Sequence, residues 1–388
     1  MFSSRFHWDF RPNRLTELLA AKRREGAGIL DLTESNPTRA GFSYPAEILR
    51  AFDDPRVLAY EPVPAGSGAA REAVAAYCAE RGQRVDASRI LLTASTSEAY
   101  AYLFKLLTDP GDQVLVPRPS YPLFEFLANM ESIEVRHYPL VYHGAWTIDL
   151  DALAGAISDR TRAIVLVNPN NPTGSYVKPG ELEALVRLAR DRRIALISDE
   201  VFSDYGLKAD ANRVATLAGV SECLAFSLSG LSKIAGLPQM KLGWMVVSGP
   251  DELRKEALEK LEWIADTYLS VGTPVQCAAG RLLAAGDVVR RQIHERCATN
   301  LAFVREAAGG SAATVLDVEG GWNVTLEVPR IRSEEEWTLS LLGEDNVLVQ
   351  PGFFYDFESE AYLIVSLLAR LEVFREGMGR VVARMRGS

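Results

Sequence analysis

The feature that most constrains the fold is an alternation of short apolar runs with longer helical patterns in the middle of the chain. The runs read as strands at residues 89–93, 113–117, 163–168, 194–198, 224–228 and 242–247. Amphipathic stretches at 97–107 and 181–193 read as helices. Strands that alternate with helices form a mostly parallel sheet covered by helices on both faces. We therefore expect an α/β fold with a large domain built on such a sheet.

Polar and aromatic side chains follow shortly after the ends of several expected strands. They are Ser95, Thr96, Ser97, Tyr121, Asn171, Asp199 and Lys233. Ligands of open α/β sheets bind beyond the carboxyl ends of the strands. A single pocket at that edge could therefore collect all of these side chains.

The character of the sequence changes after about residue 285. A helical stretch at 288–308 leads to an expected strand at 322–328 and to a final helix after Val373. The N-terminal stretch 11–24 is also helical in pattern. We expect a large domain over residues 46–285 and a smaller α+β domain formed by residues 1–45 and 286–388.

Composition excludes several classes of function. The chain has 388 residues and a formal net charge of −9, and its longest basic run is the triplet at 22–24. Nucleic acid binding needs a basic surface, so we expect none. The longest apolar runs are too short to cross a membrane.

Cysteines and histidines point to a protein without disulfides or metal. The four cysteines are widely spaced and match neither a disulfide framework nor a CxxC site, so we expect reduced thiols and a cytoplasmic location. The N-terminus lacks the apolar run of a signal peptide. The four histidines lie far apart in the sequence, so we expect no metal site.

Lys233 stands in an apolar, serine-lined stretch, FSLSGLSKIAGLPQMKLGW, at 226–244. An apolar setting lowers the pKa of a lysine amine and makes it nucleophilic toward an aldehyde. An aspartate at a strand end can keep a ring nitrogen protonated, and a helix N-terminus with hydroxyls can bind a phosphate. An aromatic side chain can stack on a planar ring. Together these groups suit pyridoxal phosphate, held by Lys233 as a Schiff base.

Each feature also has an ordinary explanation when it is taken alone. Lys233 could be a common lysine, Asp199 with Glu200 a helix cap, and Tyr121 a core residue. The stretch 168–174 could be a turn, and 95–97 a plain helix N-cap. Their order and spacing, over 233 − 95 = 138 positions, favour one shared site.

Over nearly its whole length the chain resembles the class I/II aminotransferases, which use pyridoxal phosphate and share the aspartate aminotransferase fold (fold type I). The stretch NPNNPTG at 168–174 matches the family motif N-P-x-N-P-T-G, which is highly specific. The segments ASTSEA at 94–99, PSYP at 119–122, DEVF at 199–202 and SK at 232–233 also match.

The resemblance implies a role for each matching residue. Lys233 would form the Schiff base and move the substrate's α-proton, Asp199 would pair with the pyridinium nitrogen, and Asn171 would bond the ring hydroxyl. Tyr121 would stack on the ring, and Tyr60 would reach the phosphate of the neighbouring subunit in a homodimer. The remaining phosphate and cofactor contacts would come from Ser95, Thr96, Ser97, Ser232 and Lys241. Amino acids and 2-oxo acids would be the substrates.

Two departures from the family pattern affect the cofactor. The family carries a tyrosine three positions after the aspartate, where this chain has Phe202. Losing its hydrogen bond would destabilise the ring oxyanion, and Tyr205 is the nearby tyrosine. Lys241 stands where the family has a phosphate-binding arginine, so the planar two-pronged contact is lost.

A third departure affects the substrate. The family clamps the substrate carboxylate with an arginine in a Y-x-R-x-S context, and the matching stretch here puts Ile364 at that position. The glycine of an early loop is replaced by Ser35. The stretch 351–357 resembles a segment that lines the substrate side. The candidates for another cation are Arg39, Arg118 and Arg370.

Three functions remain open at this stage. The leading one is an aminotransferase that works through Lys233 on an amino acid or related amine. The same fold and cofactor also support a lyase, decarboxylase or oxidase, because the bond that breaks depends on how the substrate is held. A non-catalytic ligand sensor is the third, although the chain has no basic segment for DNA.

Overall fold

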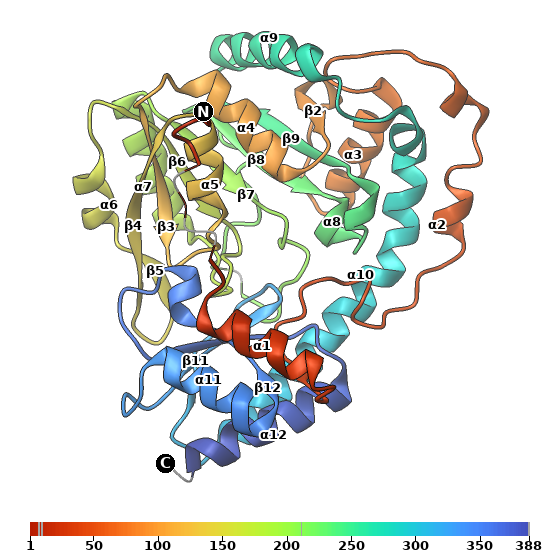
Figure 1. The fold of residues 1–388 in the computed structure, drawn as a ribbon. Helices are drawn as coiled ribbons and strands as arrows, with labels where there is room; N and C mark the ends of the chain where they lie inside the picture. Colours follow the sequence, from red (N-terminus) through yellow and green to blue (C-terminus); the bar gives the residue numbers. More distant parts are fainter. Residues whose placement is uncertain (7, 9–10, 211, 387–388) are drawn as a thin grey trace.

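The largest sheet supplies the platform for the site. In the part that the computed structural model describes (residues 1–6, 8, 11–210 and 212–386), this sheet has eight strands in the order β2-β9-β8-β7-β6-β3-β4-β5 (Figure 1). The strands are β2 (Ile90–Thr93), β3 (Gln113–Arg118), β4 (Glu134–Tyr142), β5 (Trp146–Ile148), β6 (Thr161–Val167), β7 (Ala195–Asp199), β8 (Ala225–Gly230) and β9 (Gly243–Ser248).

Most of these strands run in the same direction. The pairs β3–β4, β3–β6, β6–β7 and β7–β8 are parallel. β9 is antiparallel to both β8 and β2, so β2 points the same way as β8. The carboxyl ends of β2, β3, β6, β7 and β8 therefore meet at one edge, as the sequence predicts.

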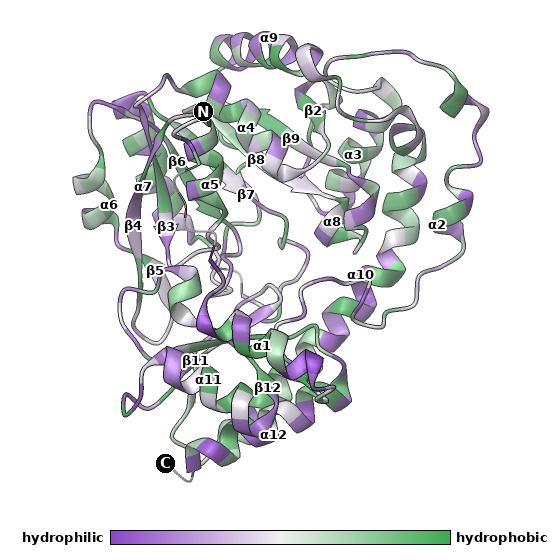
Figure 2. Ribbon diagram, in the orientation of Figure 1, coloured by the Kyte–Doolittle hydropathy of each residue, from purple (hydrophilic) through white to green (hydrophobic). Residues whose placement is uncertain are grey.

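Helices cover both faces of this sheet because its strands are apolar on both sides. In β6, Ala163 and Val165 pack under α4 (Thr96–Leu107), α5 (Leu123–Met130) and α9 (Asp251–Tyr268). Ile164 and Leu166 point the other way, toward α6 (Leu150–Ala156) and α7 (Pro179–Arg192). Figure 2 shows α9 striped with hydrophobic and hydrophilic residues, as expected for helices with one buried side. The α/β fold is confirmed.

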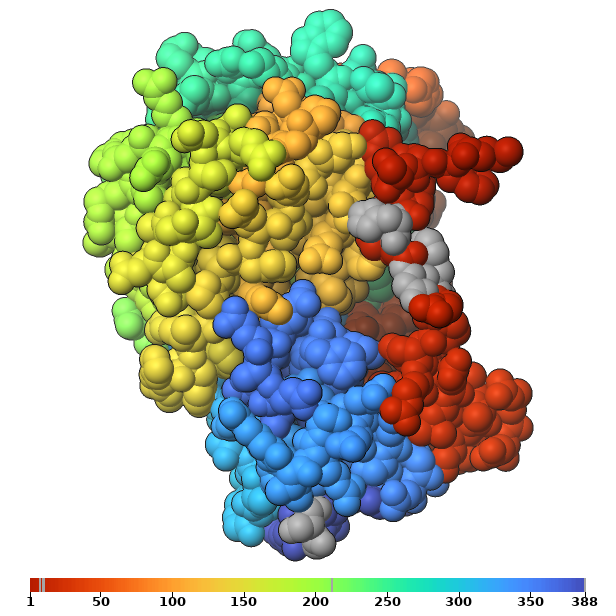
Figure 3. Space-filling view, turned by 60° about the vertical axis from the view of Figure 1, so that its left-hand side comes forward, coloured from red at the N-terminus to blue at the C-terminus, as the bar shows by residue number. Residues whose placement is uncertain are grey.

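A smaller unit joins the helix and strand near the N-terminus to the C-terminal part of the chain (Figure 3). The first residues lie instead against the large unit, where the Nε of Arg5 donates to the Ser132 hydroxyl (2.9 Å). Its sheet has the order β10-β11-β14-β13, and a two-stranded parallel pair joins β1 to β12. The elements are β1 (Leu30–Asp31), β10 (Thr314–Val315), β11 (Asn323–Glu327), β12 (Val347–Leu348), β13 (Gln350–Pro351), β14 (Tyr362–Ser366), α1 (Arg14–Arg24), α11 (Glu334–Asp345) and α12 (Leu371–Arg386). Lys22 of α1 donates to the carbonyl oxygen of Gly343 (2.6 Å), so the N-terminal helix packs on α11 as expected.

One long helix, α10 (Thr273–Ala308), connects the two units (Figure 1). It begins 15 residues before the helix expected at 288, since 288 − 273 = 15. The domain division that we expect at residue 285 falls inside this unbroken helix, and it stays a prediction. The remaining helices are α2 (Glu47–Arg50), α3 (Gly68–Glu80), α8 (Leu231–Ile234) and the 3-10 turns at Pro55–Leu58, Ala87–Arg89, Pro238–Met240 and Gly352–Tyr355.

Within the described residues, the helices are all too short or too polar to span a lipid bilayer.

Candidate active site

Lys233 lies in α8, which follows β8 directly at the carboxyl edge of the sheet. The Nζ of Lys233 is 5.0 Å from the ring centre of Trp322 and 5.6 Å from that of Phe202. Burial among these rings lowers the pKa of Lys233, and the negative charge of Asp199 opposes that shift. The amine is therefore easier to deprotonate than an ordinary lysine.

Asp199 ends β7, the strand next to β8. Its carboxylate accepts hydrogen bonds from the backbone N–H of Val201 (3.2 Å) and from the hydroxyl of Tyr100 (3.3 Å). Burial raises the pKa of Asp199 to about 6, while these hydrogen bonds and the charge of Lys233 lower it. Burial also raises the pKa of Tyr100 well above 10, so Tyr100 is a permanent donor here.

Asn171 stands in the loop that follows β6. Its Oδ1 accepts a hydrogen bond from the Nδ2 of Asn323 at 2.7 Å. The loop is also held internally: the N–H of Gly174 donates to the carbonyl of Asn170 (2.8 Å), and the Thr173 hydroxyl donates to the Asn170 side chain (2.9 Å). Because the Oδ1 of Asn171 is already engaged, its Nδ2 is left to donate to another group.

Tyr205 does not take over the task of the tyrosine that Phe202 replaces. Its hydroxyl donates to the carbonyl oxygen of Lys233 at 2.6 Å, so it anchors the lysine helix instead. Phe202 and Tyr205 both pack edge-on against Trp322, with ring centres 5.2 and 5.1 Å away. This aromatic group forms an apolar wall beside the amine of Lys233.

The first turn of α4 offers an anion site at the same edge. Ser95 is the N-cap, and its Oγ accepts the N–H of Glu98 (3.2 Å), while Glu98 accepts the N–H of Ala94 (2.6 Å). The N–H groups of Thr96 and Ser97 lie in the first turn, where no helical carbonyl is available to them. Both residues are partly exposed, so an anion could reach these N–H groups.

Other expected residues are more exposed. Tyr121 and Tyr60 are 49% and 76% exposed, and Tyr60 lines a shallow pocket with Tyr102 and Ser270. Lys241 is exposed and has a left-handed backbone (φ 52°), whereas Ser232 is partly buried. Lys233 is not among the residues that line the pocket of Tyr60.

The comparisons with known proteins agree with this geometry. A sequence profile described as "Aminotransferase class I and II" matches residues 28–370. This chain belongs to the class I and II aminotransferases. It is similar to the glutamate-pyruvate aminotransferase AlaA of Escherichia coli K12, with 33% identity over 272 residues, which is 67% of this chain and 65% of AlaA. The alignment thus spans slightly less than two thirds of AlaA.

Further relatives cover more of the chain. An alanine aminotransferase of Mycobacterium tuberculosis is 29% identical over 359 residues, which is 87% of this chain and 81% of that protein. The solved alanine aminotransferase of Pyrococcus furiosus superposes with a TM-score of 0.89 over all of both chains at 22% identity. At that identity, the likeness establishes the shared fold.

In this chain an apolar cluster fills the position at which the family resemblance places the carboxylate-binding arginine. Ile364 lies on β14 and is 1% exposed, and it packs with Trp146, Leu316, Tyr355 and Phe357. The backbone joins this cluster to the Tyr121 segment, because the N–H of Ser120 donates to the carbonyl of Tyr355 (2.9 Å). A carboxylate would find no charge at Ile364.

One of the candidate arginines is engaged elsewhere, and a second lies against Gly41. The Nε of Arg118 donates to the carbonyl of Asp356 (2.7 Å), and its guanidinium is 3.8 Å from Glu358. The exposed Arg370 lies against Gly41, where its guanidinium would be 2.7 Å from an added Cβ.

The third, Arg39, is exposed on the loop that carries Ser35. That loop adjoins the site, since the Ser366 hydroxyl donates to the carbonyl of Glu34 (2.6 Å) and the next residue, Leu367, donates to that of Trp322 (2.7 Å).

Sequence reasoning missed Tyr100, Trp322 and Asn323. Tyr100 and Asp199 are 99 positions apart, and Asn323 and Asn171 are 152 apart. No local pattern in the sequence links such pairs. The position of Tyr100, four residues into an expected helix at the carboxyl edge of the sheet, was the one available signal.

Proposed function

We propose that this protein is a pyridoxal-phosphate-dependent aminotransferase that moves an amino group between an amino acid, or a related amine, and a 2-oxo acid. The observation that carries the proposal is Lys233, an amine with a lowered pKa beside Asp199 and under Trp322. The names of the relatives, which include glutamate-pyruvate and alanine aminotransferases, support this type of substrate.

The donor set fits pyridoxal phosphate. The buried carboxylate of Asp199 accepts hydrogen bonds from Tyr100 and Val201. A protonated ring nitrogen would give this carboxylate a positively charged hydrogen-bond partner. The open N–H groups at the start of α4 suit a phosphate. Asn171 retains an amide donor for a ring oxygen. When it is bound, the cofactor supplies an electron sink for the substrate carbon.

The residues of the chain would divide the remaining work. Lys233 would hold the cofactor and, once released, move the proton between the substrate carbon and the cofactor. Asp199 would keep the ring nitrogen protonated, and Tyr100 would orient the Asp199 carboxylate. Phe202 and Trp322 would exclude water from the Lys233 amine, which preserves its lowered pKa.

The substrate carboxylate would be bound away from Ile364. Of the three candidate arginines, Arg39 is exposed and adjoins the site through the Glu34–Ser366 contact. We infer that Arg39 binds the substrate carboxylate in place of the arginine that the family carries. Tyr60 would complete the phosphate site of a second subunit in a homodimer. The four unpaired cysteines support a cytoplasmic location.

The decisive experiment is a half-reaction. Purified protein loaded with pyridoxal phosphate is mixed with single amino acids or amines, without any oxo acid, and the cofactor spectrum is followed. Full conversion of the cofactor to its amino form by one donor supports the proposal and names that donor. Product release with the original spectrum restored would instead identify a lyase, decarboxylase or oxidase. A protein that takes up no cofactor would contradict the proposal.

A further inference from the structure

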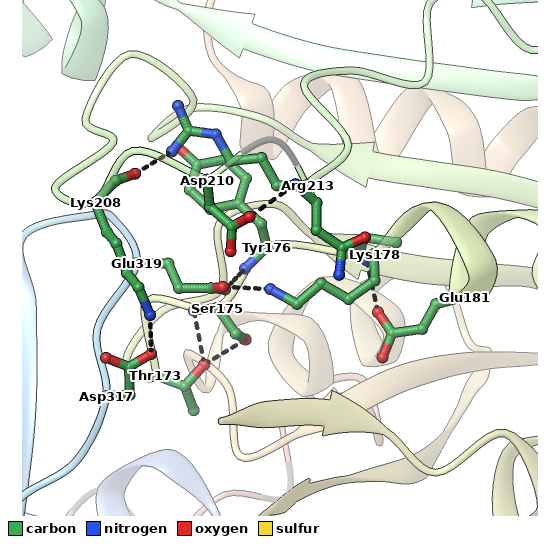
Figure 4. Close-up of polar contacts among 12 residues, drawn as sticks. Thr173, Ser175, Tyr176, Lys178, Glu181, Lys208, Asp210, Arg213, Asp317 and Glu319 are labelled. Atoms are coloured by element: carbon green, nitrogen blue, oxygen red, sulfur yellow. Dashed lines mark hydrogen bonds and ion pairs between the residues drawn. The ribbon is translucent and has the colours of Figure 1, made fainter. Parts of the chain in front are cut away.

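The segment 319–323, which leads from β10 into β11, contacts the two parts of the site that carry Lys233 and Asn171. Its sequence is EGGWN. Trp322 lies over Lys233, and Asn323 bonds Asn171. The first residue of the segment, Glu319, is remote from Lys233, and the proposed function gives it no task. Figure 4 shows Glu319 at the centre of a polar cluster between the Asn171 loop and the small unit.

Glu319 is a carboxylate that is only 5% exposed. One of its oxygens accepts the backbone N–H of Tyr176 at 2.8 Å, and the other pairs with the ammonium of Lys178. Its own carbonyl oxygen accepts the N–H of Leu207 at 2.8 Å. A buried carboxylate costs much free energy unless its partners are in place, so these contacts fix where Tyr176 can lie.

The next two residues bring the segment against the loops of the site. The N–H of Gly320 donates to the carbonyl of Gly174 (2.9 Å), and the N–H of Gly321 donates to that of Tyr205 (2.9 Å). A Cβ at Gly320 would lie 2.8 Å from both Tyr176 and the Tyr205 carbonyl oxygen, so this approach requires glycine.

The Asn171 loop is therefore clamped at both ends. Asn171 itself is held by Asn323, and five positions further on Tyr176 is held by Glu319. The loop is also stiffened by its own bonds, since the N–H of Asn170 donates to the carbonyl oxygen of Ser175 (2.8 Å). A displacement of Tyr176 is therefore transmitted to Asn171.

We propose that Glu319 is a positioning residue that, together with Asn323, orients the Asn171 amide toward the cofactor ring. This inference rests on the proposed function, because it needs a ring oxygen for Asn171 to bond. A donor that points at that oxygen stabilises its anionic form. If Glu319 is neutralised, the Asn171 amide shifts away from the ring oxygen. The anionic form of that oxygen is then less stabilised, so the bound cofactor would hold its proton more tightly.

The test compares Glu319→Gln with Asp317→Asn in the cofactor-loaded protein. Asp317 is a matched control, because it is two positions away and also forms an ion pair, with Lys208 at 3.1 Å, but does not bond the Asn171 loop. The measurement is the apparent pKa of the visible absorption band of the bound cofactor. We expect Glu319→Gln to raise this pKa by about 0.5 units, which corresponds to the loss of part of one hydrogen bond. Asp317→Asn should leave the pKa unchanged.

Asn323→Ala provides a second, independent variant that acts at the other end of the loop. It should raise the same pKa, and the double variant with Glu319→Gln should shift it by less than the two single shifts added together, because both act through Asn171. Thermal unfolding of all variants separates this effect from general destabilisation.

Three results would overturn the inference. They are an unchanged band pKa in Glu319→Gln, an equal shift in Asp317→Asn, and strictly additive shifts in the double variant. Failure of the proposed function gives different results: a protein that binds no cofactor would show no band at all, and one that binds it without transamination would be recognised in the half-reaction.

Discussion

At the scale of single residues, Glu200 contrasts with its neighbour Asp199. Asp199 faces the site, whereas Glu200 is buried and accepts hydrogen bonds from the N–H of Leu217 (2.9 Å) and the hydroxyls of Thr216 (2.7 Å) and Ser227 (3.0 Å). Burial raises the pKa of Glu200 to about 7, and these bonds lower it. Two adjacent carboxyl groups thus differ in role: Asp199 would meet the cofactor in the proposed function, whereas Glu200 ties β7 to the loop before β8 and to β8 itself.

The raised pKa of Glu200 predicts a pH-dependent stability. The folded protein holds this proton more tightly than the unfolded chain, whose glutamates titrate near pH 4.5. Stability therefore falls as the pH rises from about 4.5 to about 7, and is constant above that range with respect to this group. Glu200→Gln removes the titration, and its amide oxygen can still accept the Leu217 N–H and the Ser227 hydroxyl. We expect the melting temperature of the variant, relative to the unmodified protein, to rise between pH 5 and 7. A difference that is flat with pH would contradict this.

Arg39 leads to a prediction about substrate binding. Arg39→Met should raise the KM for the amino acid donor by roughly 10- to 100-fold, because one charge-assisted hydrogen bond to the substrate carboxylate is lost. The change in kcat should be smaller. Arg370→Met is the matched control, since Arg370 is exposed as well but packs against Gly41. Steady-state kinetics of both variants give the KM and kcat that test this prediction. An equal effect of the two would remove Arg39 as the carboxylate ligand.

At the scale of elements, the sequence predicts those parts that rest on local patterns. Periodicity predicts the alternating strands. The motifs place Asn171, Asp199 and Lys233 after the carboxyl ends of these strands. The start of α10 does not, because residues 273–287 are rich in alanine and glycine and carry a weak amphipathic pattern. Trp322 and Glu319 escape prediction for another reason: their partners are set by tertiary packing between segments more than 80 positions apart (322 − 233 = 89).

Helix α10 touches the lysine helix directly. At Gly286, an added Cβ would lie 2.4 Å from the Cβ of Ala235, which is two positions after Lys233. Gly286→Ala should therefore push the two helices apart and destabilise the protein by about 1–3 kcal/mol.

Gly280→Ala in the same helix is the control for that variant, because its Cβ would meet Ala73 at an ordinary 3.5 Å. Since alanine is the better helix former, this change should stabilise the protein by about 0.5–1 kcal/mol. Thermal denaturation of the two variants should give shifts of opposite sign. A stabilised Gly286→Ala would contradict this prediction, because it would show that α10 can shift away from Ala235 at little cost in free energy.

At the scale of the whole molecule, several large apolar side chains remain uncovered. Leu49, Leu58, Tyr60 and Trp263 are each at least 76% exposed. Exposed groups of large apolar side chains mark interfaces, which supports the homodimer inferred above. The mass in solution should then be about twice the 42.6 kDa of one chain.

The shared site can be tested by mixing two inactive variants. Lys233→Ala lacks the amine, and Tyr60→Ala would lack the phosphate contact made to the neighbour. If Tyr60 acts across the interface, a dimer with one subunit of each kind has one intact site. An equal mixture that is unfolded and reassembled should regain about a quarter of the unmodified activity, because half of the dimers are mixed and one of their two sites works. No recovery would place Tyr60 in the site of its own subunit, and a Tyr60→Ala variant that is active by itself would place Tyr60 outside the site.

The pairing of β1 with β12 also limits how early the fold can be completed during synthesis. Leu30 pairs with Val347, so the partners are 347 − 30 = 317 residues apart. At synthesis rates of roughly 5–20 residues per second, roughly 15 to 60 s pass between their emergence from the ribosome. The 319–323 segment likewise appears only after Asn171, Asp199 and Lys233 have been made. A nascent chain thus carries Lys233 before Trp322, one of the two aromatic residues beside its amine, has been made.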